Sequence, residues 1–100
     1  MTNVKNLLPI GSVIILRGAK KKLMIFGVRQ MNMESRKEFD YIGVLYPEGN
    51  VGGKSQIMFN HEDIEDVFYR GYDDEERAEF LSKLEAFYQQ KDNVENWRII

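Results

Sequence analysis

The apolar residues of this chain come in short runs separated by turn-forming residues, and this pattern constrains the fold more than any other feature. The longest uninterrupted runs, Val13–Leu16 and Leu23–Phe26, contain four residues each. A membrane-spanning helix needs about 20 apolar residues, so we expect no membrane span. Short runs rich in β-branched and aromatic residues, bounded by Gly, Pro and Asn, are typical of β-strands. The chain up to Tyr72 is therefore predicted to form a sheet.

We expect five strands in this part of the chain. Gly18 and Ala19 form a tight connection between the first two, which should pair as a hairpin. Pro47 and Gly49 mark a reversal after the third strand, because proline presets the first turn dihedral and glycine tolerates positive φ. The expected strands are Ser12–Arg17, Lys22–Arg29, Phe39–Tyr46, Gln56–Asn60 and Val67–Arg70.

After Tyr72 the pattern changes to that of one helix. Asp73 is predicted to be its N-cap, and Glu76, three positions later, has the spacing of a capping box. Apolar residues then recur at helical spacing as a single stripe, which is expected to pack on the sheet. The stripe consists of Phe80, Leu81, Leu84, Phe87 and Tyr88.

Together these elements predict an α+β fold, with a bent antiparallel sheet or partial barrel of about five strands and one C-terminal helix. A chain of 100 residues is long enough for one hydrophobic core and too short for two. We therefore expect a single domain over 1–100. The sheet should cover about 10–72, the helix about 74–91, and an apolar tail 92–100.

Composition and charge argue against several function classes. The net charge of -2 opposes the broad positive surface that non-specific nucleic-acid binding requires. With no cysteine, the chain lacks thiol nucleophiles, thiolate metal sites and disulfides. The opening residues do not have the pattern of a secretory signal peptide, so a cytoplasmic protein is expected. Charge is uneven: residues 1–60 carry nine basic and four acidic residues (+5), and residues 61–100 carry five and twelve (-7).

His61 is the only histidine of the chain and lies among carboxylates, where it could serve as a general base or a metal ligand. One histidine without cysteines makes a poor transition-metal site, and no serine has the surroundings of a nucleophile. We therefore interpret Asn60, His61 and Asp63 as structural turn residues, together with Pro47 and Gly49. No catalytic residue, metal site or cofactor is expected, and the chain is predicted not to be an enzyme.

The candidate partner-binding residues are basic or apolar ones that we expect to be exposed. Three consecutive lysines at the predicted hairpin tip suit contact with an acidic partner or a phosphate; the alternative is a solvated turn that deters edge pairing. Apolar side chains near the C-terminus should either fold back on the core or meet another chain. The candidates are Lys20, Lys21, Lys22, Tyr88, Trp97 and Ile99.

Three segments resemble a known family: LPIGSVIILRGAKKKLMIFGV at residues 8–28, YIGVLYPEGN at 41–50, and FNHEDIEDVFYRGYDDEERAEFL at 59–81. They are similar to a domain-of-unknown-function family of small Firmicute proteins encoded beside LXG-domain toxins of the type VII secretion system. The resemblance implies a cytoplasmic accessory protein without enzymatic activity, an adaptor or chaperone for the toxin before export. This role derives from the association of the genes in one locus.

The expected function is thus a non-enzymatic protein-binding module whose partner is an LXG toxin or one of its small helical companions. Formation of a homo-oligomer stays open, and no nucleic-acid partner is expected. The alternative is an SH3-like small barrel that binds nucleic acid or a regulatory ligand through the same basic hairpin, Lys20–Lys22. Salt-dependent binding to DNA or RNA would favour this alternative, and co-purification with an LXG protein would favour the first function.

Overall fold

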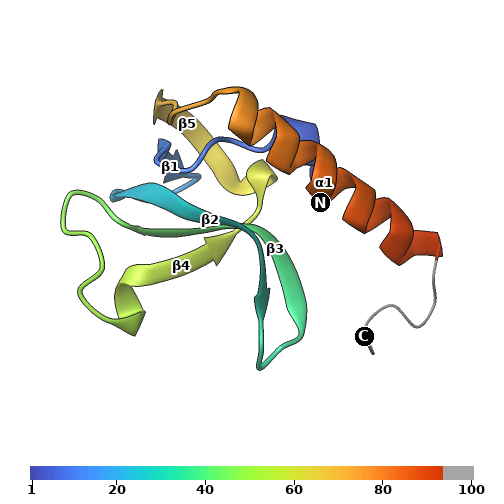
Figure 1. The fold of residues 1–100 in the computed structure, drawn as a ribbon. Helices are drawn as coiled ribbons and strands as arrows, with labels where there is room; N and C mark the ends of the chain where they lie inside the picture. The colour runs from blue at the N-terminus through green and yellow to red at the C-terminus, as the bar shows by residue number, and fades with distance from the viewer. Residues whose placement is uncertain (94–100) are drawn as a thin grey trace.

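The computed structural model describes residues 1–93, including the side chains of residues 1–90, and contains an open five-stranded sheet and one long helix (Figure 1). The strand order is β4-β3-β2-β1-β5, and all neighbours are antiparallel. The predicted α+β class and five-stranded antiparallel sheet are therefore confirmed. The elements are β1 (Val13–Leu16), β2 (Lys22–Asn32), β3 (Lys37–Leu45), β4 (Gln56–Phe59), β5 (Ile64–Tyr69) and α1 (Glu75–Asn93).

The sheet bends where β2 carries one extra residue. Ile25 pairs with Gly43 and Gly27 pairs with Ile42, so Phe26 has no partner on β3. Such a bulge increases the local twist of the strand. The bend brings β2 and β3 very close, because a Cβ atom at Gly27 would lie 2.7 Å from Cγ2 of Ile42.

The hairpin of β2 and β3 is longer than the sequence predicts. The expected strands end at Arg29 and start again at Phe39, whereas β2 continues to Asn32 and β3 starts at Lys37. The turn between them depends on Asn32, whose Oδ1 accepts hydrogen bonds from the backbone N–H groups of Glu34 and Ser35, both at 3.0 Å. The sequence does not show the apolar alternation of a strand here, because neither face of this part of the hairpin is fully buried.

The N-terminal segment supplies a large part of the core, a contribution that the sequence pattern did not predict. Its 3₁₀ turn, η1 (Val4–Asn6), is followed by Leu7 and Leu8, and these apolar side chains cover one face of the sheet. Complete burial of one such side chain stabilises the fold by roughly 1.5 to 3 kcal/mol. The buried cluster consists of Val4, Leu7, Leu8, Ile14, Leu23, Ile25, Tyr41, Phe59 and Leu81.

Helix α1 packs mainly against η1 and lies beside the N-terminal segment in Figure 1. Leu81 is buried and Leu84 is half-buried, but Phe80 is 49% exposed and Phe87 is also exposed. The prediction that the whole apolar stripe covers the sheet is therefore wrong, since the N-terminal segment occupies that position. Within residues 1–93, no helix is both long and apolar enough to cross a membrane.

The helix cap lies one residue later than predicted. Asp74 Oδ1 accepts the backbone N–H of Arg77 at 3.0 Å, which is the contact of an N-cap. Asp73, the predicted cap, instead pairs with the guanidinium of Arg77 at 3.3 Å. The expected capping box of Asp73 and Glu76 is therefore wrong. Two adjacent aspartates satisfy the same local preference, and the path of the chain before them decides between the two.

Gly71 sets that path, because two distant parts of the chain cross at this residue. A Cβ atom at Gly71 would lie 2.1 Å from the carbonyl oxygen of Ile10. The N–H of Gly71 donates to Ser12 Oγ at 3.0 Å, and this hydroxyl donates to the carbonyl of Pro9 at 2.7 Å. The segment before β1 and the segment after β5 are thereby joined, which positions the start of α1.

We predict that Gly71→Ala lowers the free energy of unfolding by about 3 kcal/mol or more, because the added methyl group overlaps backbone atoms that cannot rotate away. Gly53→Ala is the matched control, since a Cβ atom there meets nothing within 4 Å. Urea denaturation of both variants measures the difference. Equal midpoints for the two variants would contradict the close crossing at Gly71.

Asp74→Ala should reduce stability by about 0.5 to 2 kcal/mol through loss of the N-cap. Asp73→Ala should cost less, because it removes only a partly exposed ion pair. Thermal unfolding of the two single variants compares the positions directly. A larger loss for Asp73→Ala would place the cap where the sequence pattern predicted it.

Candidate functional site

A polar network ties the core to the turn that precedes β5. Tyr41 is completely buried, and its hydroxyl oxygen accepts the backbone N–H of Leu8 at 2.8 Å. The same hydroxyl lies 2.7 Å from Nδ1 of His61. The hydroxyl has one proton to donate and a second lone pair to accept with, so it can pair with either tautomer of the His61 ring.

A buried ion pair lies next to this tyrosine. The side chains of Arg29 and Asp40 are 7% and 1% exposed, and Arg29 Nε lies 3.7 Å from Asp40 Oδ1. Asp40 Oδ2 accepts the backbone N–H of His61 at 2.9 Å. Arg29 also donates to the carbonyl of Thr2, and its guanidinium lies 4.6 Å from the centre of the Tyr88 ring. Breaking such a pair leaves an uncompensated buried charge, so both partners are structurally important.

Arg29 reaches this position through an unusual backbone conformation. Its φ is 52°, in the left-handed region that residues with a side chain rarely adopt. This strain costs of order 1 to 3 kcal/mol and persists only where surrounding contacts determine the conformation. Here those contacts are the Thr2 carbonyl, the Asp40 carboxylate and the Tyr88 ring.

The network encloses little space for chemistry. A cavity of about 260 Å³ beside it is lined by Met1, Thr2, Asp40, Asn60, His61 and Glu62. Nδ1 of His61 and Oδ2 of Asp40 are occupied by hydrogen bonds within the fold. In the part of the chain that the structure describes, no group of histidine and carboxylate side chains could hold a metal ion. The geometry is that of a structural network.

The turn residues chosen from the sequence lie in two turns. Asn60 precedes the 3₁₀ turn His61–Asp63, and its N–H donates to Asp63 Oδ2 at 2.9 Å. Pro47, which follows a cis peptide bond, and Gly49, with φ of 79°, lie in the reversal after β3.

The three lysines chosen from the sequence differ in their surroundings. Lys20 is exposed beside the start of β2. Lys21 forms an ion pair of 2.7 Å with Glu48, and this contact lowers the pKa of the Glu48 carboxyl. Lys22 lies 4.9 Å from the centre of the Phe68 ring, a cation–π contact between β2 and β5. The hairpin start is therefore connected to two neighbouring segments.

The candidates near the C-terminus have a different outcome. Tyr88 is half-buried, packs against the core cluster and contacts the Arg29 guanidinium, so it serves internal packing. Trp97 and Ile99, with the rest of the tail beyond Asn93, lie outside the described residues.

A groove on the outer face of the sheet contains Lys22. Lys22 and Met24 alternate along β2 with the core residues Leu23 and Ile25, so they lie on the face opposite the core. We call this space, of about 510 Å³, the outer groove. It is lined by Gly11, Val13, Lys22, Met24, Tyr46, Phe68 and Tyr69.

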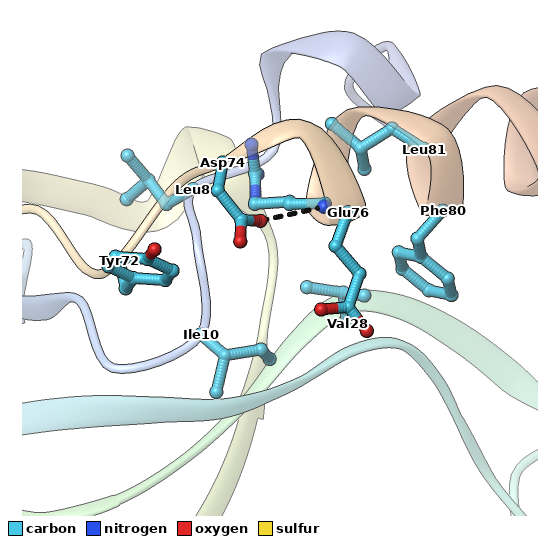
Figure 2. A pocket seen from close by; sticks show the side chains of 9 residues that line it. Leu8, Ile10, Val28, Tyr72, Asp74, Glu76, Phe80 and Leu81 are labelled. Atoms are coloured by element: carbon cyan, nitrogen blue, oxygen red, sulfur yellow. Dashed lines mark hydrogen bonds between the residues drawn. The ribbon is translucent and has the colours of Figure 1, made fainter.

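A second groove lies on the core side, between the start of α1 and the bent part of β2 (Figure 2). Figure 2 shows the Glu76 carboxylate directed toward Val28, with Phe80 on one side and Tyr72 and Ile10 on the other. We call this space, of about 390 Å³, the helix-side groove. It is lined by Leu8, Ile10, Val28, Tyr72, Asp74, Glu76, Arg77, Phe80 and Leu81.

Sequence reasoning missed most of the residues that line these grooves. Phe68 and Tyr69 are 52% and 61% exposed although they belong to a strand. The available signal was the run Val67–Tyr69, because three consecutive apolar residues on an edge strand cannot all face the core. Phe80 carried no such signal, since it fits the stripe of a buried helix face.

We predict that Tyr41→Phe lowers the free energy of unfolding by about 1 to 3 kcal/mol at neutral pH, because Leu8 N–H and His61 Nδ1 lose their partner. Burial, with a smaller contribution from Asp40, raises the pKa of Tyr41 from 10.0 to about 12. The unfolded chain therefore ionises first, and the wild type loses stability as the pH rises from 10 through 12. The difference from Tyr41→Phe should narrow over that range in denaturation curves. A constant difference would exclude this linkage.

Comparison with known proteins shows one relationship. No curated protein and no solved structure matches the chain. A family model described as a domain of unknown function, DUF4176, matches residues 7–80, from the buried N-terminal segment through β5 and into the first turns of α1. The match includes Leu8, Tyr41 and His61, so the polar network lies within it. The chain therefore belongs to the DUF4176 family of domains of unknown function.

Proposed function

We propose that the chain is a non-enzymatic protein-binding module, an adaptor or chaperone that holds an LXG toxin of a type VII secretion locus in the cytoplasm before export. The toxin assignment rests on the resemblance carried by residues 8–28, 41–50 and 59–81. The resemblance connects the chain to a toxin through the association of their genes in one locus. The binding role has physical support from the outer groove.

The observation that carries the binding role is the exposure of large apolar side chains around this groove. Phe68 and Tyr69 on β5 and Tyr46 after β3 surround it and remain largely accessible. Contiguous apolar surface of this kind marks interaction sites, and aromatic residues are enriched among those that dominate binding energy. Met24, in the wall, is flexible enough to adapt to different side chains.

The charge of the groove indicates what its partner carries. Among the residues that the structure describes, Lys22 is the only charged one in the lining of this groove, and exposed Lys20 lies two positions before it. The favoured partner is an amphipathic helix that inserts an apolar stripe and places acidic residues against these lysines. A helix lying in an apolar groove is a recurrent mode of peptide recognition.

The nucleic-acid alternative has weaker support. Exposed aromatic rings beside Lys22 resemble a base-stacking platform. However, this alternative requires an SH3-like barrel, whereas the sheet of this chain is open, with β4 and β5 as its two edge strands. The net charge of -2 also opposes a phosphate-binding surface.

Co-purification with an LXG domain tests the proposal. The wild-type chain should form a stoichiometric complex, and Phe68→Ala should raise the dissociation constant about 30-fold, as expected for a central aromatic contact. Phe87→Ala is the matched control, because this phenylalanine has similar exposure but lies on α1 and lines neither groove. Titration calorimetry measures both variants.

The outcomes separate the two parts of the proposal. Failure of the wild-type chain to bind the LXG domain would overturn the toxin assignment. A complex weakened equally by Phe87→Ala and Phe68→Ala would exclude the outer groove as the docking surface. Salt-dependent binding of a single-stranded oligonucleotide, lost in Lys22→Glu, would favour the nucleic-acid alternative instead.

A further inference from the structure

The helix-side groove combines apolar walls with an acidic mouth. Ile10 and Val28 form its floor in Figure 2, and the exposed ring of Phe80 stands beside them. Its volume of about 390 Å³ falls within the range of ligand pockets, roughly 300 to 1,000 Å³. The toxin proposal does not use this groove, because it lies on the core side of the sheet.

The carboxylates at the mouth have no matching cation. Within the described part of the chain, Arg77 is the only basic residue that lines the groove. Its guanidinium donates to the Leu7 carbonyl at 2.7 Å and pairs with Asp73 at 3.3 Å. Among the described residues, no hydrogen bond or ion pair engages the Glu76 carboxylate. The groove therefore offers a ligand at least one carboxylate that the fold does not neutralise.

The surrounding charges reinforce this negative potential. Residues 73–79 contain five acidic residues and one arginine. The start of a helix favours anionic side chains, and a cluster of carboxylates there repels an anionic ligand. A cationic group that enters the mouth meets favourable charge before it makes contact.

We propose that the helix-side groove binds a peptide segment of a partner protein that carries a large apolar residue next to a lysine or arginine. The apolar side chain enters between Ile10, Val28 and Phe80. The cationic side chain lies along the groove mouth and pairs with Glu76. Tyr72 lies at one end of the groove and is 79% exposed, so a bound segment would cover its ring.

This assignment differs from that of the outer groove in charge as well as position. Lys22 selects acidic flanks on the outer face, and Glu76 selects basic flanks on the core side. One segment cannot satisfy both grooves, because the charge that suits one is repelled by the other. The module therefore has two docking surfaces with separate specificity.

Two short capped peptides test the proposal on the full ¹⁵N-labelled chain. Both have leucine and phenylalanine at the centre, flanked by lysines in one and by glutamates in the other. The lysine peptide should shift the amide resonances of Ile10, Val28, Tyr72, Glu76 and Phe80, and its binding should weaken as salt is added. The glutamate peptide should leave these resonances unchanged.

Charge removal at two neighbouring positions provides the control. Glu76→Gln should weaken binding of the lysine peptide about threefold to fivefold, the effect of one partly exposed ion pair. Glu75→Gln removes the same charge from the same helix turn but lies outside the groove, and it should leave the affinity unchanged. Phe80→Ala should weaken binding of the lysine peptide although Glu75 and Glu76 are both retained.

Several results would overturn the proposal. Equal binding of the two peptides would show that the mouth does not select charge. Equal loss in Glu75→Gln and Glu76→Gln would indicate a general effect of net charge. Shifts that follow protein concentration and ignore the peptides would assign the groove to a second copy of the chain. None of these results depends on the identity of the outer-groove partner, so failure here leaves the toxin proposal separately testable.

Discussion

The hydrogen bonds of the buried Tyr41 hydroxyl connect the sheet, the N-terminal segment and the turn before β5. Tyr41 lies on β3, between β4 and β2, and its ring packs against Phe59 with centroids 5.4 Å apart. Its hydroxyl pairs with both Leu8 N–H and His61 Nδ1. An unpaired backbone N–H in this core would cost about 1 to 3 kcal/mol. The N-terminal segment therefore covers the sheet at the position where the Tyr41 hydroxyl accepts the Leu8 N–H. Helix α1 packs on that segment, so its position depends on the same contact.

The sequence predicted the fold where local preference and tertiary contacts agree. Short β-branched runs and glycine turns identified the strands, and the change after Tyr72 identified the helix. The prediction failed at the start of the helix, because Asp73 and Asp74 are equally suitable N-caps by residue type. The path of the chain at the Gly71 crossing places Asp74 in that position. It also failed for Leu7 and Leu8, which belong to no periodic element and become core through a contact 33 residues away.

The candidate sites were less predictable because they are assembled from distant segments. Lys22 was chosen for its charge, but its role depends on Phe68, which β5 brings beside it across β1. Tyr88 is expected from the sequence to be exposed, but its ring contacts the Arg29 guanidinium. Arg29 makes this contact from a left-handed backbone conformation that no sequence pattern predicts. Arg29 and Asp40 could not be identified as a pair, because each sits in a strand whose local pattern suits either face.

The two grooves have opposite charge, which raises the question of whether copies of the chain could bind one another through them. Lys22 in one copy and Glu76 in another would attract over a distance of about 8 Å at physiological salt. Attraction of this kind steers association but supplies little affinity without close packing. Both surfaces are hollows of several hundred Å³, so their apolar walls cannot touch when they face each other. The two grooves of two copies therefore do not suit direct contact with each other, and the docking proposed for each groove calls for a convex segment.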